Sequence, residues 1–283
     1  MEMTNKIRLS YSKAMSFLGC KFKYNLIYNE GIRLKGKSYA LQLGDVTHQM
    51  LQEINTGKFI LNHNIERLNL PELADRYLHD QSETARLAVY EAYKLILGYQ
   101  DKYKDSNYKV ISSEVIMEAD FGICTLYTRL DGITQIGNDY WRHEYKTTAK
   151  IDKAYLQGLK KGLQTGIAHI ILKEVTKVKF RGSIFDLIVK TKVPQYERNP
   201  IIVQTGLLKR TEQTITGIIT DIKAGNFYPS GQCFRCDFEP LCTAESKDQY
   251  NEVLKNFFEK KEDNGNEIKG KTVQTPVKFR IKC

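Results

Sequence analysis

Two groups of residues in this sequence are of types that do chemistry: two carboxylates with a lysine, and a set of cysteines. The first group lies in the stretch YTRLDGITQIGNDYWRHEYKTT. Its Gly137-Asn138 pair is a typical two-residue hairpin turn between strands. With that turn, Asp131 lies opposite Glu144 on the same face of an antiparallel pair. A slip of one residue would separate the two carboxylates.

The two carboxylates predict a divalent metal site. Carboxylates held close together repel each other unless a cation lies between them, and oxygen ligands suit Mg²⁺ or Mn²⁺. Lys146 lies two residues beyond Glu144 on the same face, where an ammonium group orients a water or stabilises charge on a phosphate. This set fits metal-assisted phosphodiester hydrolysis. The alternative interpretation is a solvated strand face with cross-strand ion pairs.

His48, in QLGDVTHQML, is a further candidate ligand. An imidazole added to two carboxylates shifts the preference of a site somewhat toward Mn²⁺. The alternative is an ordinary packing or surface histidine.

The second group comprises Cys233, Cys236 and Cys242, in SGQCFRCDFEPLC. This spacing lets three sulfurs reach one centre and predicts zinc or an iron–sulfur cluster, each of which needs a fourth ligand. The other cysteines are Cys20, Cys124 and Cys283. Cys124 lies in a predicted strand, where a buried free thiol is ordinary, and Cys283 is the last residue. Position therefore favours Cys20.

Composition limits the class of protein. The chain has 283 residues, 41% of them hydrophobic, which suffices for one large core or two smaller ones. Lys and Arg number 43 against 33 Asp and Glu, and the net charge of +10 favours a polyanionic partner such as nucleic acid. No apolar run approaches the roughly 20 residues of a membrane span, and the N-terminus lacks a signal peptide. We expect a cytoplasmic protein.

Hydrophobic periodicity predicts a strand-rich centre flanked by helices, hence an α/β or α+β fold. Helices are expected over 9–31, after Gly44, and over 82–104, 152–175 and 207–224. In helix 82–104 the predicted buried stripe is Leu87, Tyr90, Tyr93 and Leu97. Strands are expected over 108–117, 126–136, 140–147, 183–193 and 200–204, and residues 55–81 look irregular and polar.

The predicted helix 152–175 carries glycines at 158, 162 and 166, which favours close approach of a neighbouring element. Gln157 and Gln164 are seven residues apart and would share a face. Lys160 and Lys161 are placed to reach a phosphate backbone, or simply form a solvated face.

The order of these motifs resembles the RecB-type nucleases of the PD-(D/E)XK superfamily, in the branch with a C-terminal iron–sulfur cluster that includes AddB and the CRISPR-associated iron–sulfur exonucleases. The resemblance spans residues 8–245 and rests on LSYSKAMSFLGCKFKY, GDVTHQML, RLDGI, HEYKTT and GQCFRCDFEPLC. It implies a PD-(D/E)XK core with a central mixed sheet flanked by helices. It also implies a metal-dependent DNA exonuclease acting on single strands or DNA ends in recombination, repair or phage and CRISPR DNA processing.

The resemblance assigns roles to individual residues. It implies that Mg²⁺ or Mn²⁺ is held by His48, Asp131 and Glu144, with the Tyr145 carbonyl close to the ion. Lys146 would serve the attacking water, and Gln164 matches the glutamine of the family's helix motif. A 4Fe–4S cluster would be held by Cys20, Cys233, Cys236 and Cys242.

One position departs from the family pattern: the tyrosine expected four residues after the glutamine is Ala168 here, so Gln157 remains an alternative to Gln164. The implied organisation is a single nuclease domain over 1–258, with a helical insertion over 55–107. A cluster region over 225–245 is stapled to Cys20, and a basic, partly mobile tail covers 259–283. No GxxxxGK[ST] motif is present, so the chain is expected to be a stand-alone nuclease or one subunit of a larger machine, with a helicase or a recombination or integration protein as the candidate partner. The alternative is a catalytically idle iron–sulfur DNA-binding subunit.

Overall fold

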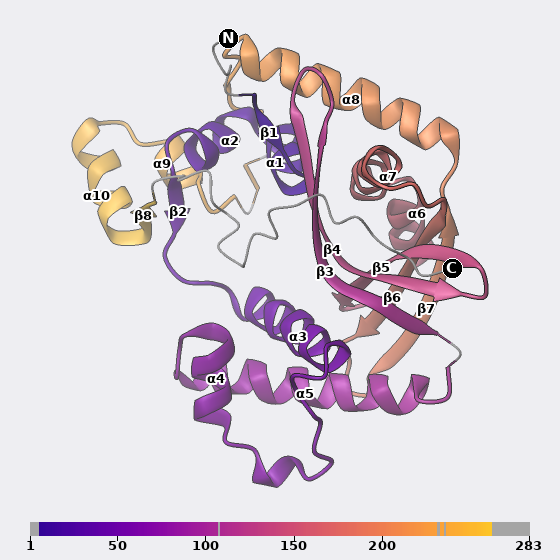
Figure 1. The fold of residues 1–283 in the computed structure, drawn as a ribbon. Helices are drawn as coiled ribbons and strands as arrows, with labels where there is room; N and C mark the ends of the chain where they lie inside the picture. Colours follow the sequence, from indigo (N-terminus) through magenta and orange to yellow (C-terminus); the bar gives the residue numbers. More distant parts are fainter. Residues whose placement is uncertain (1–5, 107, 231–232, 235, 262–283) are drawn as a thin grey trace. The chain divides into compact units, whose positions relative to one another are not determined.

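The computed structural model describes residues 6–106, 108–230, 233–234 and 236–261 (Figure 1). The chain separates into two compact units. We call the first the terminal unit; it comprises Met1–Gly36, Glu118–Tyr127 and Lys209–Cys283. The second, the central unit, comprises Lys37–Met117 and Thr128–Leu208. No helix in the described part of the chain is long and apolar enough to cross a membrane.

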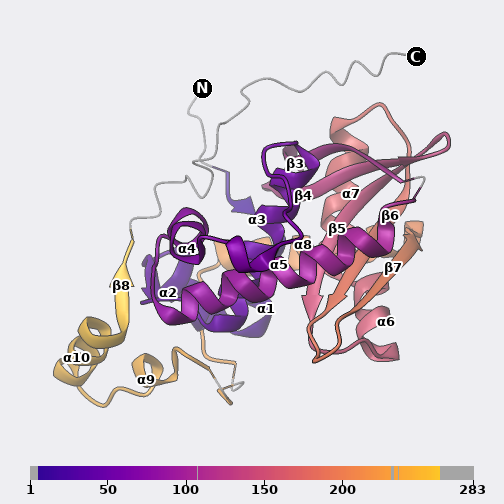
Figure 2. The same ribbon diagram turned by 90° about the horizontal axis from the view of Figure 1, so that it is seen from below.

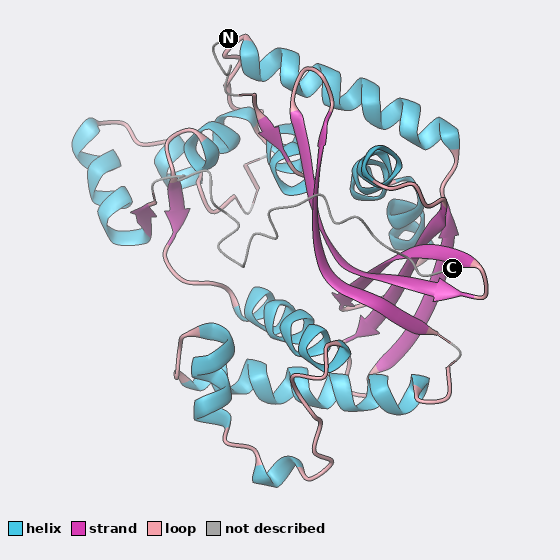
Figure 3. Cartoon of the chain, viewed as in Figure 1, coloured by secondary structure: helices cyan, strands magenta, loops and turns pink. Residues whose placement is uncertain are grey.

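A mixed sheet forms the centre of the fold (Figure 3). Its strands pair in the order β4 (Thr125–Ile136), β5 (Asp139–Thr148), β6 (Phe180–Val189) and β7 (Gln195–Ile202), and β3 (Lys109–Asp120) pairs with β4. The β4–β5 and β6–β7 pairs are antiparallel, whereas β5 and β6 are parallel. A parallel pair needs a crossover, which α6 (Lys153–Lys161) and α7 (Leu163–Val175) supply. The α/β fold with a mixed sheet is confirmed, as are the strands predicted over 108–117, 126–136 and 140–147. The last two strands exist but begin earlier than predicted, at Phe180 instead of residue 183 and at Gln195 instead of residue 200.

Alternate residues of β5 point to opposite faces of this sheet. On one face, α3 (Tyr39–Asn55), α4 (Leu70–Leu78) and α5 (Glu83–Tyr103) share one hydrophobic core with Tyr145 and Ile188 of the sheet. On the other face, α7 packs against β6. Figure 2 shows α5 running along the helical layer beside α3.

The helical layer differs from the sequence prediction in two ways. Helix α4 lies within residues 55–81, which were expected to be irregular; Asn69 caps its start and it buries Ala74 and Tyr77. In α5 the predicted stripe is wrong at Leu87, which is 50% exposed. The buried face combines three alanines with larger side chains: Ala85, Ala88, Val89, Ala92, Tyr93, Leu95, Ile96 and Tyr99.

The predicted single helix over 152–175 is two helices, which meet at Gly162. This residue has extended backbone, with ψ 147°, and a side chain there would lie 2.6 Å from the Gly158 carbonyl oxygen. Gln157 therefore lies exposed on α6, while Gln164 lies in the first turn of α7. The prediction that a neighbouring element approaches closely at Gly158 is also wrong, because nothing lies within 4 Å of the position that its Cβ would take.

The terminal unit is built mainly from the N-terminal and C-terminal parts of the sequence. Its elements are β1 (Arg8–Leu9), α1 (Tyr11–Gly19), α2 (Lys21–Tyr28), β2 (Ile32–Leu34), most of α8 (Thr205–Lys223), α9 (Glu239–Cys242), α10 (Lys247–Phe257) and β8 (Phe258–Lys260). Ser10 caps α1 as predicted. Cys20 separates α1 from α2, and its Sγ accepts a hydrogen bond from the Lys23 N–H. Strand β2 pairs with β8. Most of the predicted basic tail, 262–283, lies outside the described residues.

The sheet leaves no room for a side chain at Gly182 of β6. A Cβ there would overlap the Ile201 carbonyl oxygen of β7. We expect Gly182→Ala to lower the free energy of unfolding by about 1–3 kcal/mol in a urea titration. Gly158→Ala, in open space on α6, should raise it by about 1 kcal/mol. Unchanged stability of Gly182→Ala would contradict this packing.

Candidate active site

The predicted hairpin register is confirmed. Residues 137–138 form the turn, and Gly137 has a left-handed φ of +58°. The ladder between β4 and β5 runs from Ile136 opposite Asp139 to Gly132 opposite His143. Its last pair comes directly before Asp131 and Glu144, so the two carboxylates lie where regular strand pairing ends.

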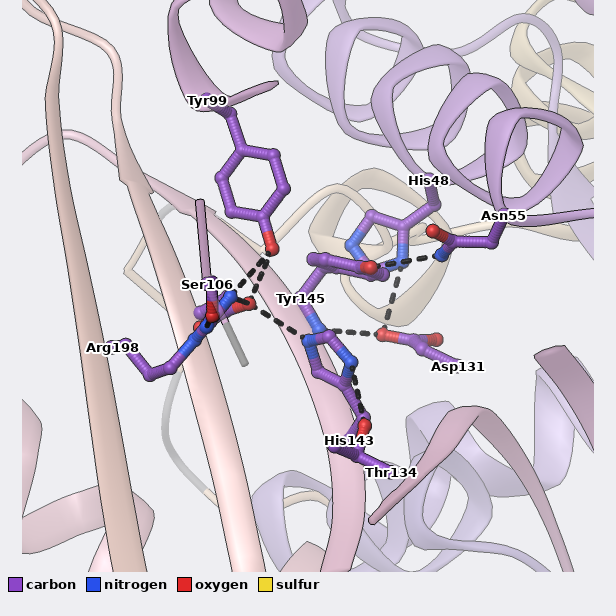
Figure 4. A network of polar contacts seen from close by, with 10 residues as sticks. His48, Asn55, Tyr99, Ser106, Asp131, Thr134, His143, Tyr145 and Arg198 are labelled. Atoms are coloured by element: carbon purple, nitrogen blue, oxygen red, sulfur yellow. Dashed lines mark hydrogen bonds and ion pairs between the residues drawn. The ribbon is translucent and has the colours of Figure 1, made fainter. Parts of the chain in front are cut away.

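At this point the Asp131 carboxylate takes the place of a strand partner (Figure 4). The Tyr145 N–H donates to Asp131 Oδ2 at 2.8 Å. The same oxygen lies 3.3 Å from Nδ1 of His48, which projects from α3. The Tyr145 hydroxyl in turn accepts a hydrogen bond from Asn55 Nδ2 at 2.9 Å. The end of the ladder thus joins β4, β5 and α3 at one carboxylate.

The charges of this group support one another. Burial alone would raise the pKa of Asp131, but the charge and hydrogen bond of His48 and the N–H of Tyr145 outweigh it, and the pKa falls to about 2. Burial alone would lower the pKa of His48, but Asp131 raises it overall. Asp131 is therefore ionised at neutral pH and faces a partner that favours its charge.

The Glu144 carboxylate is almost completely buried, at 3% exposure, and both of its oxygens are bound. Oε1 accepts hydrogen bonds from Lys146 Nζ and from Gln164 Nε2, each at 2.6 Å. Oε2 accepts one from Arg142 Nη2. Lys146 keeps 26% of its side chain exposed, so this end of the site is open to solvent.

Arg142 is a site residue that the sequence analysis missed. Its side chain is wholly buried on the same face of β5 as Glu144. Its Nη1 lies 3.4 Å from Ser183 Oγ, and Ser183 Oγ lies 2.9 Å from His169 Nε2. Burial and the charge of Arg142 lower the pKa of His169 to about 3, so His169 stays neutral. One signal in the sequence could have found it. Arg142 lies two residues before Glu144 in the predicted strand 140–147, so the two side chains share a face.

A second buried cluster supports the other face of β5. Asp186 of β6 accepts hydrogen bonds from Arg198 Nε at 2.8 Å and Nη2 at 2.9 Å, and from the Tyr99 hydroxyl. His143 Nε2 lies 3.0 Å from the same carboxylate (Figure 4). The His143 ring lies 4.3 Å from the Tyr145 ring, centroid to centroid. This cluster therefore packs directly against the residue whose N–H binds Asp131.

Burial alone would raise the pKa of Asp186, but hydrogen bonds from His143 and Arg198 lower it to about 2. A buried carboxylate with this many donors is a rigid anchor for the strands around it. No motif in the sequence singled it out, because its partners lie on three other elements, β5, β7 and α5.

The structure brings the predicted residues together as two adjoining contact sets, listed here. The first is His48, Asp131 and Tyr145; the second is Glu144, Lys146 and Gln164. The alternative Gln157 has no place in either, because it is exposed on α6. Ala168, which replaces the family tyrosine, is buried on α7.

Carboxylates with one imidazole are the donor types that Mg²⁺ and Mn²⁺ accept. Across the described residues, no three His, Cys, Asp or Glu side chains are arranged as a metal site as they stand. Glu144 Oε1 is occupied by Lys146 and Gln164, so an ion that binds this oxygen must share it with these donors or displace them. The residues fit such an ion by the chemistry of their donor atoms, and binding it would require these contacts to change.

The candidate cluster ligands all lie in the terminal unit, and the described cysteines form no disulfide. Burial alone would raise the pKa of Cys20, but hydrogen bonds from Lys23 and Ser230 outweigh it and lower the pKa. The pKa of Cys242 is raised by burial and then by the thiols of Cys233, Cys20 and Cys236. Cys124 is a buried thiol with a pKa raised by burial to about 11, and Cys283 lies outside the described residues.

The ion pair between Arg142 and Glu144 should be strongly coupled. We expect Arg142→Met to lower the free energy of unfolding by about 3–5 kcal/mol, because it removes a partner from a buried carboxylate. Glu144→Gln added to Arg142→Met should recover part of this loss. Urea titration in EDTA of the wild type, the two single variants and the double variant gives the coupling energy between Arg142 and Glu144. Additive effects of the two substitutions would show that the pair does not act as a unit.

Comparison with known proteins comes from sequence and from structure. The family model of the PD-(D/E)XK nuclease superfamily matches residues 8–243. No curated protein matches the sequence. A crystal structure from Eubacterium rectale named "Putative exonuclease" is similar at a TM-score of 0.56 and 18% identity, covering 82% of this chain and 87% of that one. The crystal structure of SSO0001 aligns at a TM-score of 0.33 and 19% identity, over 75% of this chain and 98% of that one.

The similarity to the Eubacterium rectale structure supports the fold, and the family match covers most of the chain, including both contact sets and the four candidate cysteines. The chain belongs to the PD-(D/E)XK nuclease superfamily.

Proposed function

We propose that this protein is a metal-dependent DNA exonuclease that hydrolyses phosphodiester bonds of single-stranded DNA or of DNA ends. The observation that carries the proposal is that Asp131, Glu144 and Lys146 lie on neighbouring strands where the hairpin ladder ends. His48 and Gln164 contact these carboxylates from separate helices. The name of the Eubacterium rectale structure adds support for the exonuclease class.

In this proposal, Mg²⁺ or Mn²⁺ is held by His48, Asp131 and Glu144, together with the Tyr145 carbonyl. When bound, such an ion polarises the scissile phosphate and lowers the pKa of a bound water. Lys146, released from Glu144 Oε1, orients the attacking water or stabilises negative charge on the phosphate. The partly exposed position of Lys146 supports this role, since its ammonium group can reach a substrate.

Arg142 and Gln164 divide the work of holding Glu144. Arg142 occupies Oε2 from the buried side, and it keeps the carboxylate fixed when an ion binds at Oε1. Gln164 reaches Oε1 from the first turn of α7, so it acts as a positioning residue for this carboxylate. The assignment of Gln164 over Gln157 rests on this contact.

We also propose a 4Fe–4S cluster on Cys20, Cys233, Cys236 and Cys242. Support comes from the Cys233-x2-Cys236-x5-Cys242 spacing, from the presence of Cys20 in the same unit, and from the lowered pKa of Cys20, since thiolates are the form that binds iron. Such a cluster would link Cys20 to chain segments more than 200 residues away. The Lys21–Asp221 ion pair, at 2.6 Å, already joins residues 200 apart. Its role is a structural staple.

The activity is tested with DNA labelled at either the 5′ or the 3′ end, single-stranded and duplex, in Mg²⁺, in Mn²⁺ and in EDTA. We expect cleavage with either ion and none in EDTA. Lys146→Ala and Glu144→Gln should each lower the cleavage rate at least 100-fold, because the first removes the ammonium group that acts on the water or the phosphate and the second removes a charged ligand of the ion. The matched control is Gln157→Ala, which should cleave at the wild-type rate.

Equal cleavage by folded Lys146→Ala and wild type would contradict the assigned site. No cleavage by folded wild-type protein under any of these conditions would favour the idle DNA-binding subunit.

The cluster is tested by anaerobic purification and absorbance. We expect broad absorbance near roughly 400 nm, typical of thiolate-bound iron–sulfur centres, with loss of colour and a lower Tm in Cys233→Ser. Cys124→Ser, which alters a buried thiol outside the set, should keep the colour. Colourless protein with stoichiometric zinc would contradict the cluster and leave the nuclease proposal intact.

A further inference from the structure

The terminal unit carries a row in which cations and aromatic rings alternate. Arg33 lies 5.2 Å from the Tyr28 ring centroid, and Lys13 Nζ lies 5.2 Å from the same centroid. Lys13 Nζ is also 6.0 Å from the Tyr127 centroid, and Arg8 lies 5.0 Å from it. We call these five residues the cationic row.

The members of the cationic row come from five elements: β2, α2, α1, β4 and β1 (Figure 1). All five side chains are partly exposed. A cation over an aromatic ring gains about 0.5–1 kcal/mol at such sites, and the long stems of Lys and Arg pack on the rings while their heads stay in water. The rings therefore help to hold the side chains of Lys13, Arg33 and Arg8 in place, and Arg8 is also ion-paired with Glu118.

The ends of the row are fixed by further contacts. Arg33 Nη1 donates to the Ile27 carbonyl, and Arg8 Nη2 donates to Glu118 of β3. Tyr28 packs on the buried Tyr24 ring, with centroids 5.1 Å apart. These contacts orient the row, and its five side chains are partly exposed.

The terminal unit also contains exposed aromatic side chains. Within the described part of the chain, the aromatic residues classed as exposed are Tyr228 at 55%, Phe234 at 87% and Phe257 at 60%, all in the terminal unit. Lys21 Nζ lies 4.6 Å from the Tyr228 ring centroid and 3.0 Å from its hydroxyl. Tyr228 thus repeats the pairing of ring and cation found in the row.

We propose that the terminal unit binds single-stranded DNA, with the cationic row on the sugar–phosphate backbone and Tyr228 stacking against a base. Positively charged side chains that track a backbone, combined with exposed rings, are typical of sequence-tolerant binding to single strands. In a duplex the base faces are already stacked on one another, so the exposed rings favour an unpaired strand. The choice of DNA as the ligand rests on the proposed function.

The test uses the full chain in EDTA, where metal-dependent cleavage cannot proceed, and measures fluorescence anisotropy of a labelled oligothymidine over a range of salt concentrations. We expect Lys13→Gln to weaken binding and to lower the slope of log K against log[salt] by about 0.7, the value for one lost phosphate contact on a single strand. Lys13→Arg should restore the slope. Tyr228→Leu should weaken binding about tenfold while changing the slope less.

The matched control is Lys94→Gln. Lys94 also lies over a tyrosine ring, 5.2 Å from the Tyr90 centroid, but it belongs to the central unit and pairs with Glu91 at 3.4 Å. It should bind with the wild-type affinity and slope. Thermal melting confirms that each variant is folded, and the salt slope is a quantity that a purely structural role of Lys13 would not change.

Wild-type affinity and slope in folded Lys13→Gln would overturn the proposal. Duplex DNA that binds as tightly, with the same loss in Lys13→Gln, would overturn the assignment to single strands. The outcome is independent of catalysis. Weaker binding in Lys13→Gln, together with a wild-type protein that cleaves no DNA, would refute the proposed activity alone. Cleavage by the wild type, together with unchanged binding in Lys13→Gln, would refute the binding surface alone.

Discussion

The central unit depends on the burial of one charge, the Glu144 carboxylate. A carboxylate removed from water costs several kcal/mol unless donors replace the water. Here Arg142 and Lys146 supply two of them from the same strand, because residues spaced by two share a face. Gln164 supplies the third from α7. These three donors replace the water that the Glu144 carboxylate loses where its exposure is 3%.

This requirement explains the break between α6 and α7. A continuous helix over 152–175 would place Gln157 and Gln164 on one face. The extended backbone at Gly162 instead starts a new helix, and Gln164 then lies in its first turn, within 2.6 Å of Glu144. On the opposite face of β5 a second buried carboxylate, Asp186, is also held by several donors, and His143 is one of its partners. Tyr145, which lies beside His143, binds Asp131 through its backbone N–H.

The sequence allowed the strands, the hairpin register and most of the contact sets to be predicted. These features follow from local signals: strand alternation, a two-residue turn, and the spacing of Asp131, Glu144 and Lys146. The features it did not reveal depend on tertiary contacts. Arg142 has an ordinary charged side chain until a fold buries it, and Asp186 finds its partners on β5, β7 and α5. The buried face of α5 includes Ala85, Ala88 and Ala92, whose weak hydrophobicity gives little periodic signal.

The central claim is that Asp131 and Glu144 together bind a divalent ion. An anomalous difference map from a crystal grown with Mn²⁺ tests it most directly, because it locates the ion independently of activity. The account predicts a peak in contact with both carboxylates, with Lys146 and Gln164 shifted from Glu144 Oε1 and Arg142 still bound to Oε2. A map from crystals containing both Mn²⁺ and DNA that shows no peak at these carboxylates would contradict it.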